Sequence, residues 1–85
     1  MDAIVKKYKH ITSCQLGNKG MIFSFETLAS YEVNEIGILI FNLINNKRRV
    51  SDIVKKLQKT YNTKEINKHV LEFLSSLKKE KIIFY

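Results

Sequence analysis

Few residues of this chain have the types and spacing that catalysis or metal binding requires. Cys14 is the only cysteine, so the sequence has no internal disulfide and no zinc site built from several cysteines. His10 and His69 belong to different expected elements and have no carboxylate motif beside them. Gly17 and Gly20 are not followed by the Lys-Ser/Thr pair of a phosphate-binding loop. We therefore expect no enzymatic activity, no metal and no cofactor.

Two further patterns have ordinary structural interpretations. A lone cysteine in a strand-like stretch is most often a small buried hydrophobic residue, so we expect Cys14 to be buried. Glu65 and Glu72 are seven residues apart and can share a helix face. On a lysine-rich helix such carboxylates are more often paired with neighbours such as Lys68 than used as a catalytic acid and base. Binding is a better expectation than catalysis.

The charge of the chain is unevenly distributed. Residues 1–43 contain four basic and four acidic side chains, whereas residues 44–85 contain eleven basic and four acidic ones, so the whole net charge of +7 belongs to the second half. A surface of this sign favours nucleic acid, an acidic peptide or an acidic protein, and charge alone does not choose among them. A lysine-rich face that only maintains solubility is the other interpretation.

Length and composition predict one globular domain spanning residues 1–85. A chain of 85 residues is too short for two independent cores, and a hydrophobic content of 45% argues against disorder. No apolar run approaches the roughly 20 residues that cross a bilayer, and the first ten residues lack the apolar centre of a signal peptide. We expect a cytoplasmic protein that does not enter a membrane.

The first half of the chain has the patterns of strands. Residues 1–9 read as a loosely held lead-in, and residues 10–16 as a half-exposed strand. Residues 17–20 form the expected hairpin turn, and in the second strand Met21, Phe23 and Phe25 give one strongly apolar face. A third strand follows at residues 28–33, in which Tyr31 and Val33 alternate with polar residues.

The second half predicts three helices. Asn34 is suited to cap the first helix, at residues 35–45, which is apolar on nearly every side and should be buried. Ser51 is the expected N-cap of the second helix, and Asn62 or Thr63 that of the third. The apolar tail at residues 82–85 should fold back as a short extended segment. The fold class is thus α+β and winged-helix-like, with a three-stranded antiparallel sheet followed by three helices.

Two binding modes are compatible with such a fold. A winged helix can set a helix into the major groove of DNA. The exposed residues of the third helix, however, do not form the Arg/Asn/Gln-rich face expected for reading base edges, and Arg48 and Arg49 lie between helices. Alternatively, a peptide can add as a strand to the free edge of the sheet. We favour the second mode and keep DNA binding as the alternative.

A groove between the third strand and the third helix is the natural place for such a peptide. Leu71 lies at the margin of the apolar stripe of that helix, so it either lines the groove as an exposed anchor or only widens the core face. Lys68, Lys78 and Lys79 would flank the groove with positive charge and favour an acidic peptide.

Several segments together resemble the PqqD-like family, also called the RiPP recognition element, where RiPP stands for ribosomally synthesised and post-translationally modified peptide. They are Y-E-V-N-E-I-G at residues 31–37 with the apolar run to Leu43, K-R-R-V-S-D-I-V at 47–54, Tyr61, V-L-E-F-L-S-S-L at 70–77, and Ile82 with Ile83. The similarity covers about residues 20–84 and rests on the order and spacing of these segments.

The resemblance implies a small non-catalytic domain that binds the leader of a precursor peptide. Members look like winged helices in which the leader adds to the third strand and lies against the third helix. The domain then presents the peptide to a modifying enzyme, often a radical S-adenosylmethionine enzyme, a cyclase or a protease. Carried onto this sequence, the implied peptide-binding residues are Leu28, Ala29, Ser30, Tyr31 and Glu32 on the strand, and Lys68, Leu71, Glu72, Ser75 and Lys78 on the helix.

Overall fold

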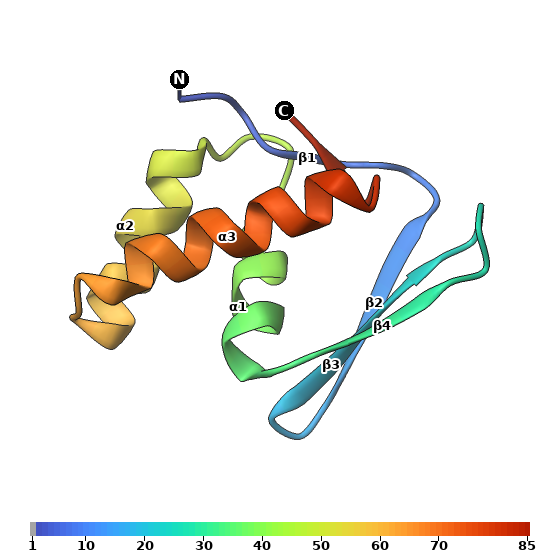
Figure 1. Cartoon of the computed structure of the whole chain (residues 1–85), viewed down its shortest axis with the longest axis horizontal. Coiled ribbons are helices and arrows are strands. Elements are labelled where there is room, and N and C mark those ends of the chain that lie inside the picture. The colour runs from blue at the N-terminus through green and yellow to red at the C-terminus, as the bar shows by residue number, and fades with distance from the viewer. Residues whose placement is uncertain (1) are drawn as a thin grey trace.

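The computed structural model describes residues 2–85 and contains two small antiparallel sheets and three helices. One sheet has the strand order β2-β3-β4, and the other pairs β1 with β5. In Figure 1, α1 lies between the three-stranded sheet and the other two helices. The elements in chain order are β1 (Lys6–Lys7), β2 (Ile11–Leu16), β3 (Lys19–Ser24), β4 (Ser30–Val33), α1 (Glu35–Leu43), α2 (Val50–Tyr61), α3 (Glu65–Lys79) and β5 (Ile83–Phe84).

The predicted fold class is confirmed, because strands β2 to β4 form a three-stranded antiparallel sheet that precedes three helices. The first turn is tighter than expected. Leu16 pairs with Lys19, so only Gly17 and Asn18 remain in the turn, and Gly17 has the positive φ of +63° that glycine adopts without steric cost. Within residues 2–85, no helix is long and apolar enough to cross a membrane.

The apolar alternation in the second predicted strand suggested which face of the sheet is buried. The structure buries the opposite face. Ile22 is fully buried and Ser24 nearly so, whereas Phe25 is 63% exposed. The reason is the small residue Gly20, which allows α1 to approach the sheet closely. A Cβ at Gly20 would lie only 2.6 Å from Cδ1 of Ile38. The core therefore forms where the backbone can approach, and not where the largest side chains alternate.

Helix α1 is the buried centre of the molecule, as the sequence predicts. The Asn34 side-chain oxygen accepts a hydrogen bond from the Gly37 amide at 2.8 Å, which confirms the expected cap. Ile38, Ile40 and Phe41 are each 1% exposed. The helix ends at Leu43, two residues before the expected end, and the side chain of Asn45 then accepts bonds from the amides of the following turn.

Helix α2 begins differently from the prediction. Its first residue is Val50, and the Arg49 amide at its start donates to the Asp52 carboxylate at 2.9 Å. Ser51, the expected N-cap, lies inside the helix instead. The Ser51 amide and hydroxyl both donate to the carboxylate of Asp2, at 2.9 and 2.7 Å. A distant residue thus satisfies a free amide of the first turn.

The chain ends pack against the helices and against each other. Residues 1–9 were expected to be loosely held, but Val5 is fully buried and its amide donates to the Arg48 carbonyl at 3.0 Å. Lys6 and Lys7 pair with the tail, so the prediction that residues 82–85 fold back in extended form is confirmed. Cys14 is exposed and not buried, because it pairs with Met21 on the sheet face that points away from α1.

Candidate functional site

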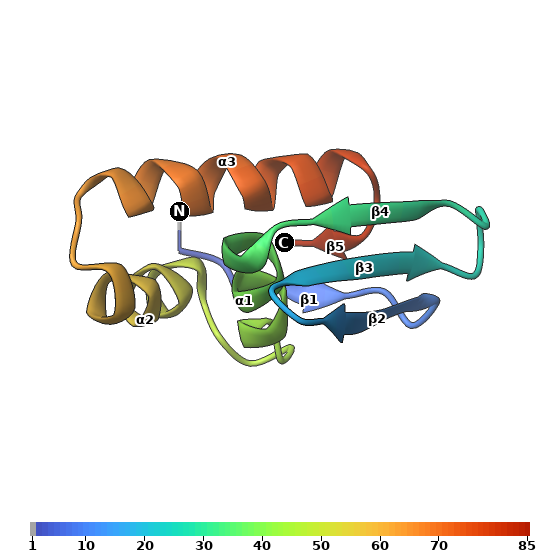
Figure 2. The same cartoon turned by 90° about the horizontal axis from the view of Figure 1, so that it is seen from below.

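Strand β4 is an open edge of the three-stranded sheet. The Ser24 amide donates to the Ala29 carbonyl at 2.9 Å, which fixes which residues face β3. In an antiparallel ladder the residues alternate, so Tyr31 and Val33 also bond toward β3. The backbone groups of Ser30 and Glu32 consequently point away from β3, where another strand can pair with them. Figure 2 shows β4 as the strand of its sheet that lies nearest to α3.

The strand is shorter than predicted, because Leu28 and Ala29 belong to the turn before it. The Leu28 amide donates to the Ser24 carbonyl at 2.8 Å, and the Ala29 amide donates to the Thr27 hydroxyl at 3.3 Å. Leu28 has a positive φ of 62° and a side chain that is 73% exposed. A left-handed conformation is costly for leucine, so this exposed apolar side chain is held at the start of the open edge against a local preference.

One side of α3 faces β4 and the start of α1. The Tyr31 hydroxyl donates to Glu80 Oε2 at 3.3 Å, which joins β4 to the end of the helix. Near the other end of the strand, a Cβ placed on Gly37 would lie 3.1 Å from Val33 Cβ and 3.2 Å from Phe73 Cε1. A hollow of about 160 Å³ opens here, lined by Asn34, Ile36, Gly37, Ile40, His69 and Phe73. It is mainly apolar and suits a single aliphatic or aromatic side chain.

Most of the helix residues expected to line the groove lie elsewhere on α3. Leu71 lines a different hollow together with Val50 and Val54 of α2. At about 100° per residue, Leu71 and Phe73 are roughly 200° apart around the helix, so they cannot face the same strand. Lys78 points its ammonium group over the Tyr85 ring, 4.4 Å from its centroid.

The other predicted helix residues are exposed on the solvent side of α3. Lys68 forms an ion pair with Glu72 at 3.9 Å, and Ser75 is exposed. Of the helix residues predicted to bind the peptide, Glu72 lies closest, around the helix axis, to the side that carries Phe73. The side that adjoins β4 instead carries His69, Phe73 and Glu80. The 69/73 spacing is that of helix neighbours, but the sequence alone does not distinguish the two flanks of the apolar stripe of this helix.

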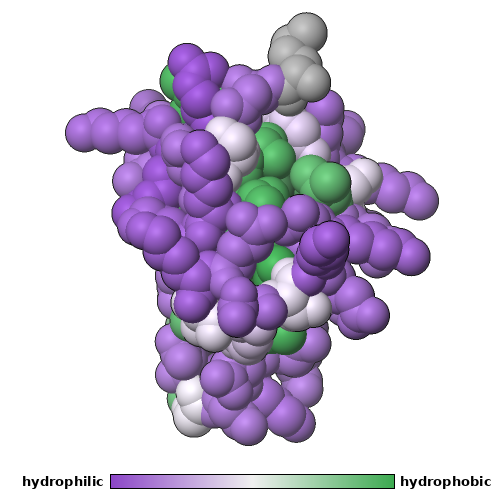
Figure 3. All heavy atoms as spheres, turned by 90° about the vertical axis from the view of Figure 1, so that its left-hand side faces the viewer, coloured by the Kyte–Doolittle hydropathy of each residue, from purple (hydrophilic) through white to green (hydrophobic). Residues whose placement is uncertain are grey.

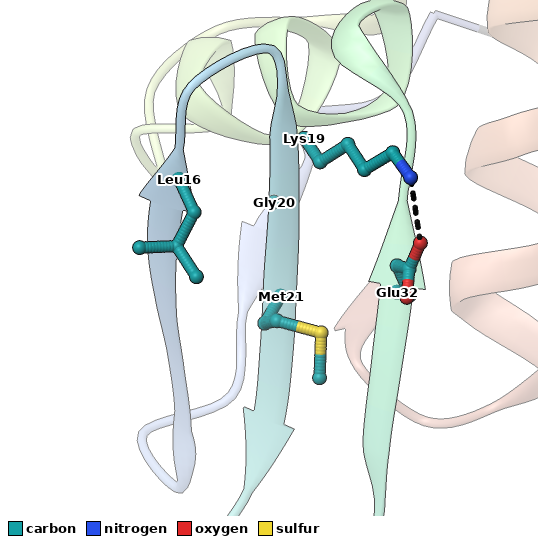
Figure 4. Close-up of a pocket in the computed structure, with 5 residues that line it drawn as sticks. All are labelled: Leu16, Lys19, Gly20, Met21 and Glu32. Carbon is teal, nitrogen blue, oxygen red and sulfur yellow. Dashed lines mark ion pairs between the residues drawn. The ribbon is translucent and has the colours of Figure 1, made fainter.

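The outer face of the sheet carries an ion pair beside the open edge. Lys19 of β3 forms an ion pair with Glu32 of β4 (Figure 4). Lys19 Nζ lies 3.6 Å from Glu32 Oε1. These two residues, with Leu16, Gly20 and Met21, line a shallow hollow of about 180 Å³. The Glu32 side chain is therefore engaged across the outer face, while its backbone amide and carbonyl remain directed at the open edge.

An open edge strand beside the last of three helices defines a small winged-helix-like α+β domain. The chain belongs to the PqqD family, because the model of that family, described as coenzyme PQQ synthesis protein D, matches residues 19–83. This confirms the resemblance found in the sequence. None of the curated proteins matches the chain.

Two solved structures are similar to this fold over nearly their whole length. One is described as "TbiB1 in Complex with the TbiA(beta) Leader Peptide"; it has a TM-score of 0.82 and 16% identity, and the match covers 92% of this chain and 93% of that one. The other is "Lasso peptide synthetase B1 complexed with the leader peptide", with a TM-score of 0.82, 14% identity, and coverage of 98% and 100%. At such identities the match defines the fold, and neither structure supports the DNA-binding alternative.

Proposed function

We propose that this protein is a non-catalytic binding partner for the leader of a ribosomally synthesised precursor peptide. The leader adds as a further strand to β4, pairing with the backbone groups of Ser30 and Glu32, and lies beside α3. The observation that carries this proposal is the open edge of β4, held next to α3 by the bond from Tyr31 to Glu80. The two similar structures support it, since both contain a leader peptide.

Strand addition provides affinity from the backbone and specificity from side-chain pockets. An added strand directs alternate side chains to the two sheet faces. One set turns toward α3, where the hollow beside His69 and Phe73 takes an apolar side chain of the leader. The other set turns to the outer face, next to the Lys19–Glu32 ion pair.

The preference for an acidic leader needs revision on this geometry. Lys68 pairs with Glu72 on the solvent side of α3, and Lys78 lies over Tyr85, so neither ammonium group is directed at β4. Of the charged residues beside the open edge, Glu32 is balanced by Lys19, whereas Glu80 has only the neutral Tyr31 hydroxyl as its partner in the described part of the chain. We therefore propose that the segment of the leader paired with β4 is neutral or basic, whatever the charge of the rest of the leader.

The bound leader is then presented, in the cytoplasm, to a separate modifying enzyme. A radical S-adenosylmethionine enzyme, a cyclase and a protease are the candidates that the family resemblance suggests. The protein itself binds and orients the leader. Once the enzyme also holds this complex, the precursor reaches the active site in an effectively intramolecular step.

The test is a titration of the full chain with a fluorescently labelled leader peptide from a precursor encoded beside its gene. A scrambled leader and a duplex DNA serve as controls, at moderate salt. We expect saturable binding of the leader alone, with amide shifts of Ser30 and Glu32 in NMR spectra. Tight DNA binding with no response to any neighbouring leader would overturn the proposal.

A further inference from the structure

A second hollow lies on the side of α3 opposite to β4. It has a volume of about 520 Å³ and is formed between α2 and α3, where Val50, Val54 and Leu71 supply apolar side chains and Lys55, Gln58 and Asn67 polar ones, beside Asp2 and Ser51. Figure 3 shows this side of the molecule, with a hydrophobic patch enclosed by hydrophilic side chains. The leader-binding edge does not use this surface.

The apolar part of the hollow is exposed and has a fixed shape. Leu71 is 51% exposed, although it adjoins two partly buried valines of α2. Gln58 Nε2 donates to Asn67 Oδ1 at 2.6 Å, which bridges the two helices at this position. Because α2 and α3 also pack together through the buried core, a partner would meet a groove that already exists, and the protein would lose little freedom on binding it.

The surroundings of the hollow are positively charged. Lys55 lines it, and Gln58 also borders a neighbouring hollow that is lined by Lys64. Asp2 is the only acidic residue among its lining. The carboxylate of Asp2 accepts both hydrogen bonds from Ser51, and these bonds are the main cause that lowers its pKa. Asp2 stays ionised and offsets part of the positive charge around it, but Arg49 and Lys55 both act on its carboxylate. With Lys64 beside the neighbouring hollow, these cations outnumber the one carboxylate of the lining and favour an anionic partner.

We propose that this hollow binds an acidic amphipathic helix of a partner protein. The apolar side of such a helix fits against Val50, Val54 and Leu71, and its carboxylates face Lys55 and Lys64, which is the helix-in-groove mode of recognition. An extended nucleic acid would satisfy the lysines but leave the apolar floor uncovered. The proposal does not rest on leader binding, and the position of the hollow allows both ligands to bind at once.

The experiment uses the full chain with ¹⁵N-labelled amides and ¹³C-labelled Leu and Val methyl groups. Two synthetic helical peptides share one leucine face and carry either glutamate or lysine on the other side, and a duplex DNA is the third ligand. We expect the glutamate peptide to shift the methyl signals of Val50, Val54 and Leu71 and to leave the Ser30 and Glu32 amides unmoved. The lysine peptide should bind at least about tenfold more weakly.

Two pairs of variants separate this site from general surface effects. Leu71→Glu should weaken binding of the glutamate peptide by about tenfold or more, while the same change at Leu16, a still more exposed leucine on the sheet, should not. Lys55→Glu should weaken binding of the glutamate peptide more than Lys9→Glu does. Lys9→Glu makes the same change of charge in the first half of the chain. Equal binding of both peptides, unmoved Leu71 methyls, or tighter binding of DNA at this surface would each overturn the proposal. Shifts at β4 with a leader test the proposed function separately.

Discussion

The Tyr31 hydroxyl donates a hydrogen bond to Glu80 Oε2 at 3.3 Å and so joins β4 to the C-terminal end of α3. These residues are 49 positions apart in the chain. Desolvation and the adjacent Glu80 carboxylate raise the pKa of Tyr31, so its hydroxyl remains a donor at neutral pH. The bond thereby helps to set the width of the space in which the leader is proposed to lie.

Tyr31→Phe should therefore weaken leader binding by a few-fold and leave the fold intact, since the ring still packs against the core. Glu80→Ala should have the same effect, whereas Glu80→Gln keeps an acceptor oxygen and should retain more affinity. Calorimetric titration of the single variants and the Tyr31→Phe/Glu80→Ala double variant is the measurement. Full additivity of the two losses would contradict a role for this bond.

Ser30→Pro should weaken leader binding by roughly fivefold or more, because proline removes the amide that faces the open edge. The fold should persist, since that amide does not bond to β3. Tyr31→Pro is the matched contrast, because the Tyr31 amide faces β3 and its loss should unfold part of the sheet. Circular dichroism checks the fold of each variant. Unchanged leader affinity in folded Ser30→Pro would show that this amide does not pair with the peptide.

Leu28→Gly should raise the free energy of unfolding by about 1 kcal/mol, because glycine adopts the positive φ of this position without steric cost. The same variant should bind the leader more weakly, since it removes an exposed apolar side chain at the start of the open edge. Urea denaturation and a leader titration measure the two effects. A more stable variant with wild-type affinity would remove Leu28 from the binding site.

Gly20→Ala should destabilise the protein by about 1–3 kcal/mol, because the new methyl group would overlap the Ile38 side chain. A second change, Ile38→Val, removes one methyl group at the contact and should restore part of the loss. Gly17→Asn is a useful control, since its position has open space and a left-handed backbone that asparagine tolerates. Denaturation curves that coincide for wild type and Gly20→Ala would refute the close approach of α1 to the sheet.

Acidification should release the first residues from α2. The pKa of Asp2 is lowered below its usual 3.8, chiefly by the bonds from Ser51. Its folded form therefore favours the carboxylate, so its contribution to stability is present above pH 3.8 and is lost as the pH falls below that value. Between neutral pH and about pH 3, wild type should lose more stability than Asp2→Ala. The Ser51 amide signal should titrate with Asp2, and a signal that stays constant over this range would argue against the contact.

Local patterns of the sequence predict much of the fold. The cap at Asn34, the apolar run after it and the stripes of the later helices predict three helices, because capping and burial at a period of 3.6 residues are properties of each segment alone. The alternation at Tyr31 and Val33 likewise predicts the last strand of the sheet. The apolar character of the tail predicts that it folds back and packs against the rest of the domain.

Only the tertiary structure decided how these elements face one another. Periodicity locates the core stripe of α3 but not which flank of that stripe adjoins β4, so Leu71 was expected in the groove and lies beside α2 instead. Two small residues, Gly20 and Gly37, let α1 approach both β3 and α3, and the contacts that require them, with Ile38 and Phe73, join residues that are distant in sequence. Burial of Val5 and exposure of Cys14 have the same origin. Each depends on which long-range surfaces pack together, and that information does not reside in any single segment.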